Sequence, residues 1–230
     1  GFQHRRPAHP DAHGPGGRPL RQTFLGTARL NSTPAFLRWF RLLRVAGLLF
    51  QGVVTAAELL SVAAFDEGRH AQAFPSFGSE RTGAPVVAFC RIADREIRVR
   101  EPVVHPDALV VQDATLLHQV DVFAGLKPEG YVLINSTGTA SDLGLDEIAA
   151  SLPAGRLITL PATEIARTHI GRPVPNLVML GGLAAFTGIV HLPALLEAME
   201  EHFPGALGEK NAAAATAAYE LVQSLVPSQN

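Results

Sequence analysis

The sequence predicts an α/β fold in which helices flank a mostly parallel sheet that also carries one β-hairpin. Short runs of consecutive apolar residues, typical of strands buried on both faces, alternate along the chain with segments of helical periodicity. The chain has 230 residues, of which 47% are hydrophobic and 17% charged. It is therefore long enough and apolar enough to bury a core, as a globular protein does.

From residue 51 onward, helices and strands follow one another in a regular order. Apolar residues at helical spacing predict a helix over 53–68, which ends at Gly68. An extended piece over 70–77 and a polar turn come next, and strands over 85–92 and 96–100 are expected to form the hairpin. The further predicted strands cover 108–112, 131–135 and 156–160, and the further predicted helices cover 116–124, 142–150, 163–170, 177–189, 192–203 and 211–225.

The first fifty residues differ in composition from the rest of the chain. They carry eight arginines against Asp11 as the only acid, a charge of +7, whereas the remaining residues carry −9. Five prolines and three histidines, without aliphatic periodicity, precede residue 35, so this stretch buries too little apolar surface to offset its ordering entropy. We therefore expect an atypical, poorly ordered Arg/Pro-rich segment over 1–50 and a folded domain over 51–226.

Three interpretations of the first segment remain open. It resembles an organellar transit peptide, it has the charge of a nucleic-acid-binding arm, and it reads as a start that is not part of the ancestral domain, which we favour. Its last part places Phe36, Phe40, Leu43 and Gly47 on one helical face. This spacing predicts a helix or an irregular segment before residue 51 rather than a strand.

Composition excludes several classes of function. A net charge of −2 gives no general argument for nucleic acid or an anionic membrane as partner. The single Cys90 rules out a disulfide framework and an all-cysteine metal or iron–sulfur site, and its apolar neighbours predict a buried, inert thiol. The nine histidines are scattered and predict no metal site. The longest uncharged apolar run, over 45–57, is shorter than the roughly twenty residues that span a membrane, so we expect a cytoplasmic protein.

The motifs of autonomous catalysis and nucleotide binding do not occur in the sequence. It has no G-x-S-x-G elbow and no Walker A run, and no G-x-G-x-x-G follows a predicted strand. We therefore assign no catalytic residue to this chain.

Two polar clusters are candidates for ligand or subunit contacts. Gln51 and Gly52 lead directly into a helix and would point free backbone N–H groups at an anion, although a simple helix start explains them equally. The loop over 74–85 is long and polar, as ligand-binding loops are, with a solvated connector as the alternative. Its candidate residues are Ser79, Glu80, Arg81 and Thr82.

A third cluster lies at the start of the helix expected over 177–189. Asn176 is a plausible N-cap for that helix and a further candidate contact. Gly181 and Gly182 within it each cost about 1 kcal/mol relative to alanine, which predicts close backbone packing rather than chemistry.

Several longer runs follow one another in a fixed order over residues 51–220. They are Q-G-V-V-T-A-A-E-L-L (51–60), H-A-Q-A-F-P-S-F-G-S-E-R-T-G-A-P-V (70–86), V-V-Q-D-A-T-L-L (110–117), P-N-L-V-M-L-G-G-L (175–183), H-F-P-G-A-L-G-E-K-N (202–211) and A-Y-E (218–220). In this order and spacing they resemble the gamma subunit of 2-oxoacid:ferredoxin oxidoreductases, particularly those of the pyruvate synthase type.

The resemblance implies a place in a complex that converts pyruvate, coenzyme A and oxidised ferredoxin to acetyl-CoA, CO2 and reduced ferredoxin, or the reverse. It implies a Rossmann-like fold similar to domain III of the single-chain enzymes. Thiamine diphosphate and Mg2+ would lie between alpha and beta subunits, and [4Fe-4S] clusters in the delta and beta subunits. This chain alone would bind none of these cofactors, and its role would be to contact coenzyme A as a substrate and to cover the active site.

Two alternatives stay open beside this interpretation. The partner enzyme could be of the 2-oxoisovalerate type, or the chain could be a stand-alone Rossmann-like small-molecule binding protein without a redox partner. One departure from the family pattern bears on the helix start. The family opens with a strand and a loop close to H-G-R-G-G-Q-G, whereas here R-V-A-G-L-L-F stands before Gln51 and Gly52. We therefore expect residues 1–50 to replace the first strand, with a weakened anion site.

Overall fold

The computed structural model describes residues 41–47, 50–76, 86–99 and 101–226. All of them belong to the second of the two units into which contacts divide the chain, residues 33–230. Within these ranges, the helices are too short or too polar to cross a membrane. The poorly ordered segment expected before residue 41 and the polar turn over 78–83 lie outside the described residues.

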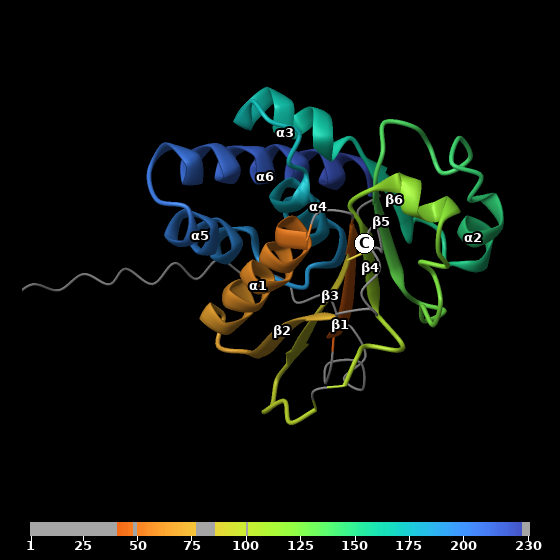
Figure 1. The fold of residues 1–230 in the computed structure, drawn as a ribbon, viewed down its shortest axis with the longest axis horizontal. Helices are drawn as coiled ribbons and strands as arrows, with labels where there is room; N and C mark the ends of the chain where they lie inside the picture. The colour runs from red at the N-terminus through yellow and green to blue at the C-terminus, as the bar shows by residue number, and fades with distance from the viewer. Residues whose placement is uncertain (1–40, 48–49, 77–85, 100, 227–230) are drawn as a thin grey trace, which may run out of the picture. The chain divides into compact units, whose positions relative to one another are not determined.

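Six strands of the described chain form one sheet in the order β2-β3-β1-β4-β5-β6 (Figure 1). β1, β4, β5 and β6 are parallel to one another, and β3 is antiparallel to both of its neighbours. Only β3 therefore runs opposite to the others, which confirms the predicted α/β class with a mostly parallel sheet. The strands are β1 (Arg41–Gly47), β2 (His70–Ser76), β3 (Val86–Ala93), β4 (Ala108–Val111), β5 (Tyr131–Asn135) and β6 (Leu157–Leu160).

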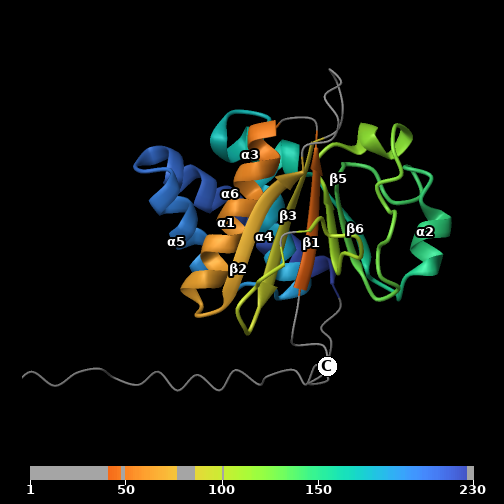
Figure 2. The same cartoon turned by 60° about the horizontal axis from the view of Figure 1, so that its bottom comes forward.

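The helices cover the two faces of the sheet unequally. Of the α-helices, all except α2 lie on one face, and α2 lies on the other, as Figure 2 shows. The larger core forms beneath the five helices, and a smaller one, which includes Leu109, Val111 and Leu116, forms on the opposite face. The helices are α1 (Phe50–Asp66), α2 (Asp146–Ser151), α3 (Ala162–Ile170), α4 (Asn176–Thr187), α5 (Leu192–His202) and α6 (Ala206–Leu225), with a 3-10 helix over Ala114–His118.

The prediction of a helix or irregular segment before residue 51 is wrong for residues 41–47, which form β1. Leu43 and Val45 are fully buried in the larger core, while Arg44 and Ala46 point to the opposite face. This alternation is too short to outweigh the helical spacing in the sequence. Hydrogen bonding decides the conformation instead, because β1 pairs along one edge with β3 and along the other with β4.

The predicted hairpin is correct in type and wrong in its partners. Residues 96–99 form no strand, because β2 and β1 already occupy both edges of β3. β2 and β3 pair instead, with His70 opposite Ala93 and Ser76 opposite Val87. Among the helices, α2 and the 3-10 helix are shorter than predicted, and α6 begins five residues earlier.

Close packing explains the glycines of α4 as predicted. A Cβ atom on Gly181 would lie 2.0 Å from the backbone oxygen of Ala215 in α6. At Gly182 the obstruction is the end of a side chain, the Cδ2 atom of Leu160, at 2.6 Å. Gly181 therefore lets two helix backbones meet where no other residue fits.

Candidate functional site

The order of the strands points to one place on the sheet. β1 leads through α1 toward β2 and β3 on one side, whereas β4 leads to β5 and β6 on the other. The direction of the chain therefore reverses between β1 and β4, and in open α/β sheets ligands bind in the crevice at the carboxyl ends of strands that flank such a point. α1 begins there, three residues after the last residue of β1.

Gln112 lies at this point, directly after the last residue of β4. Its backbone N–H donates to the carbonyl oxygen of Ala46 at 2.8 Å, which continues the pairing of β4 with β1. Its side chain is 8% exposed. The side-chain Oε1 atom lies 3.3 Å from the place that a Cβ atom on Gly47 would take and 3.7 Å from the corresponding place on Gly52. The amide group of Gln112 therefore lies between the end of β1 and the first turn of α1.

Gly47 leaves the room for this arrangement. A Cβ atom on Gly47 would lie only 2.8 Å from the Cγ2 atom of Val53. Contacts that short essentially do not occur, so a larger residue at position 47 would push α1 or Gln112 away. Gly52 differs, because its own Cβ would meet Asn176 at 3.6 Å, an ordinary van der Waals distance.

Asn135 ties the ends of β4 and β5 to the start of α3. Its Nδ2 atom donates to the carbonyl oxygen of Gln112 at 2.9 Å and to the hydroxyl of Thr163 at 2.8 Å. In return, the backbone N–H of Thr163 donates to Oδ1 of Asn135 at 3.1 Å. Both the Nδ2 and the Oδ1 atom of Asn135 thus have partners within the protein. Asn135 therefore holds the main chain of Gln112 in place and is not free to bind a ligand.

The N-termini of α1 and α4 meet at this edge. Asn176 is the first residue of α4 and contacts the space next to Gly52, and neither helix has an acidic residue in its first turn. Asn176 is not the predicted N-cap, because Pro175 takes that position and makes no side-chain capping bond. Free N–H groups and the partial positive charge of two helix starts favour an anion here. We call Gly47, Gly52, Gln112, Asn135, Thr163 and Asn176 the carboxyl-edge cluster.

The structure brings together two of the residues proposed from sequence, Gly52 and Asn176. Gln51 lies in the first turn of α1, with its side chain outside the described residues, and the four candidates of the polar loop also lie outside them. The ends of that loop are fixed, since Ser76 pairs with Val87, and Val86 pairs with Gly47. These four polar-loop candidates are Ser79, Glu80, Arg81 and Thr82.

Gln112 and Asn135 were not identified from sequence. The signal that could have found them is simple. Each is the polar residue that follows an apolar strand run, V-V-Q and V-L-I-N, and parallel strands bring their carboxyl ends to one edge.

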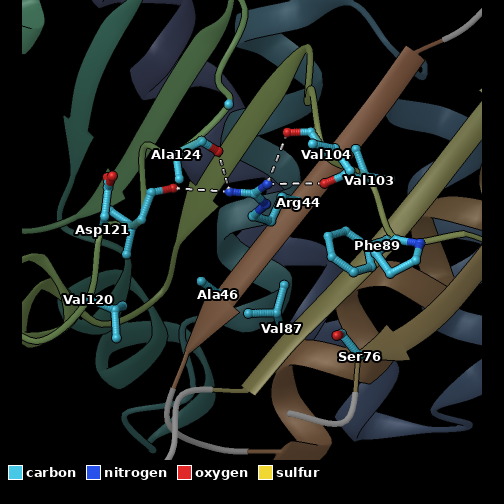
Figure 3. A pocket seen from close by; sticks show the side chains of 13 residues that line it. Arg44, Ala46, Ser76, Val87, Phe89, Val103, Val104, Val120, Asp121 and Ala124 are labelled. Carbon is cyan, nitrogen blue, oxygen red and sulfur yellow. Dashed lines mark hydrogen bonds between the residues drawn. The ribbon is translucent and has the colours of Figure 1, made fainter.

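A separate cavity of about 500 Å3 lies on the sheet face that the five helices do not cover (Figure 3). Among its described lining residues, Arg44 of β1 is the cationic one, and aliphatic side chains such as Val87 and Val120 form much of the remainder. The guanidinium donates to the carbonyl oxygens of Ala124 at 2.9 Å and Val103 at 3.0 Å, with two longer contacts of 3.4 Å. Burial lowers the pKa of Arg44, against the charge of Asp121, which raises it. Its donors are thus directed at backbone carbonyls, and the residue fastens two loops to the sheet.

Comparison with known proteins decides the family. The model of the family described as pyruvate ferredoxin/flavodoxin oxidoreductase matches residues 43–221. The chain belongs to this family. It is 49% identical over 170 residues to pyruvate synthase subunit PorC of Methanothermobacter marburgensis, which covers 74% of this chain and 90% of that relative. It is 47% identical over 169 residues to the common gamma subunit of the pyruvate/ketoisovalerate oxidoreductases of Thermococcus kodakarensis, covering 74% and 90%.

Among solved structures, the pyruvate oxidoreductase subunit PORC of Thermotoga maritima superposes with a TM-score of 0.66 and 34% identity. The match covers 79% of this chain and 96% of that one. Sequence and structure thus agree on the pyruvate ferredoxin/flavodoxin oxidoreductase family, and these relatives are PorC or gamma subunits, the type that the sequence motifs resemble. The family match begins at residue 43, within β1, so the strand that we expected to be replaced belongs to the matched region.

Proposed function

We propose that this chain is the gamma subunit of a multi-subunit pyruvate:ferredoxin oxidoreductase in the cytoplasm, assembled with alpha, beta and delta subunits. The complex would oxidise pyruvate with coenzyme A to acetyl-CoA and CO2, and pass the electrons to ferredoxin. The observation that carries this proposal is the 49% identity over 90% of a pyruvate synthase subunit.

The residues of this chain fit a supporting role and not a redox role. A [4Fe-4S] cluster needs several thiolates, whereas the chain has one cysteine, Cys90, which is fully buried. Burial raises the pKa of the Cys90 thiol to about 12, so it is protonated at neutral pH. Among the described residues, no group of three or more His, Cys, Asp or Glu side chains could hold a metal ion. Thiamine diphosphate, Mg2+ and the clusters would accordingly belong to partner subunits.

In this role the carboxyl-edge cluster would meet coenzyme A or a partner subunit. Gln51, Gly52 and Asn176 stand at helix starts, which suits a phosphate group. From the polar loop, Arg81 would offer a charge-assisted contact to a phosphate or carboxylate, beside Ser79, Glu80 and Thr82. In the assembled complex, Arg81→Ala should raise the KM for coenzyme A or weaken assembly, and unchanged kinetics with unchanged assembly would remove this loop from the account.

Reconstitution tests the proposal as a whole. The full chain is expressed with and without tagged alpha, beta and delta subunits, and coenzyme A-dependent reduction of ferredoxin by pyruvate is measured. We expect the gamma chain to co-purify and the activity to require it. An active enzyme that assembles without the chain, while the chain runs as a free monomer, would instead favour a stand-alone small-molecule binding protein.

The reconstitution should be repeated with a second 2-oxoacid, because one relative with 47% identity is a common gamma subunit of pyruvate and ketoisovalerate oxidoreductases. We expect this chain to assemble with catalytic subunits of either type. When pyruvate and 2-oxoisovalerate are compared in both reconstituted complexes, we expect the preferred 2-oxoacid to change with the catalytic subunits, and a preference that stays the same with either set would contradict this.

A further inference from the structure

The side-chain amide of Gln112 contains a buried hydrogen-bond donor, Nε2, that is unsatisfied within the described part of the chain. Its Nε2 atom is shielded from solvent and has no hydrogen-bond partner among the residues that the structure describes, and the residue as a whole is only 8% exposed. The main chain of Gln112 is fixed on both sides, by Ala46 and by Asn135. Buried donors are nearly always paired, so the unpaired amide of a residue whose main chain is fixed indicates a missing hydrogen-bond partner within reach of that amide.

The position of the amide shows what kind of acceptor fits. Its Oε1 atom faces the first turn of α1, 3.7 Å from the Cβ position of Gly52, and Asn176 at the start of α4 borders the same space. The two amide atoms exchange places by a half-turn of the terminal torsion, so the NH2 group can be presented to the same space. A neutral donor beside two helix N-termini without acidic residues in their first turns is suited to a phosphate oxygen.

We propose that Gln112 is a ligand-positioning residue, whose amide donates a hydrogen bond to a phosphate group held at the N-termini of α1 and α4. The inference rests on the proposed function in so far as coenzyme A would then supply that phosphate. It adds the residue that follows β4 to a contact otherwise made by helix starts. Because the main chain of Gln112 is fixed and its amide is buried, the bond also sets the place of the phosphate along the sheet edge.

Binding to the full chain tests this directly. Inorganic pyrophosphate and adenosine 3′,5′-bisphosphate are titrated by calorimetry into wild type and into Gln112→Met, which keeps the length of the side chain and removes its donors. We expect the dissociation constant to rise about two- to tenfold, the loss typical of one neutral hydrogen bond. We also expect the Tm of the ligand-free variant to hold or to rise, since an unmet buried donor has been removed. If Gln112 had a merely structural role, the variant would instead lower the Tm together with the affinity.

Two further variants make the test specific. Gly52→Ala adds a methyl group at ordinary contact distance and a better helix former, so the chain should fold at least as stably while the phosphate is kept from the helix start. Gln72→Met is the matched control, because Gln72 in β2 also has a buried, unpartnered side-chain atom, Oε1. We expect its affinity for both ligands to stay within twofold of wild type.

The outcomes separate this inference from the proposed function. If the adenosine compound binds more tightly than pyrophosphate and is weakened two- to tenfold in Gln112→Met, the phosphate belongs to a nucleotide. If the two ligands bind equally and are weakened alike in that variant, the site takes an inorganic anion. Equal affinities in wild type and Gln112→Met, or no binding to wild type, would overturn the inference even if the reconstituted complex is active. A chain that binds phosphate through Gln112 but joins no complex would refute the proposed function alone.

Discussion

Replacing Arg44 with methionine should destabilise the fold by about 3 kcal/mol. The variant keeps much of the apolar stem and removes the guanidinium, which donates to two carbonyl oxygens at 2.9 and 3.0 Å and reaches two more at 3.4 Å. A hydrogen bond to a charged group contributes about 1.5–3 kcal/mol, and we take the lower value for the two short bonds because Arg44 is half-buried. The long pair is too weak to add to this sum.

Urea unfolding followed by far-ultraviolet circular dichroism measures the effect, and about 3 kcal/mol corresponds to a fall in Tm of about 6–12 °C for a domain of this size. Arg44→Lys should be destabilised less than Arg44→Met but more than wild type, since one ammonium group cannot reach carbonyl oxygens on both loops. Arg98→Met is the control, because Arg98 forms an exposed ion pair with Glu96 and should change stability by less than about 1 kcal/mol. If Arg44→Met is as mild as this control, the guanidinium contributes no net stability and our reasoning fails.

Three further predictions concern the glycines of α4, Asn135 and Cys90. Gly181→Ala should destabilise the chain by more than about 3 kcal/mol in urea unfolding because helix backbones would clash, whereas Gly182→Ala meets a movable side chain and should cost less. Asn135→Ala should cost about 2 kcal/mol in the same assay by leaving Thr163 and a strand carbonyl unpaired. Native Cys90 should resist iodoacetamide. The pKa of its thiol is about 12 in the folded chain and about 9 in the unfolded chain. Between pH 9 and pH 12 the free energy of unfolding of wild type should therefore fall by about 1.4 kcal/mol per pH unit relative to that of Cys90→Ala.

The fold class could be predicted because most strands are long enough to read as apolar runs. The strand β1 could not, since the run around Leu43 fits a helical face as well as a strand, and only its pairing with β3 and β4 settles the choice. The predicted strand pairing of the hairpin was wrong for a related reason. A strand can be expected from its own residues, but its partner depends on which edges are already occupied, and both edges of β3 are.

The candidate site shows the same division. Gly52 and Asn176 could be proposed from sequence because helix starts have local signals. Gln112 could not be singled out by type, since a glutamine after a strand is common on protein surfaces. Its burial depends on Gly47, which stands sixty-five residues away in the sequence and makes room for the amide. Such a site requires knowledge of which segments the fold places side by side.

The reversed direction of β3 has a consequence for how this family can vary. β2 ends and β3 begins on adjacent positions of the sheet, with Ser76 opposite Val87 and Val86 opposite Gly47, so both ends of the nine-residue connection lie at one edge. Doubling the length of such a connection changes the free energy of closing it by only about 0.6 kcal/mol. Insertions can therefore accumulate beside the start of α1 with little effect on stability, and evolution or an engineer can reshape what the subunit presents there without altering the sheet.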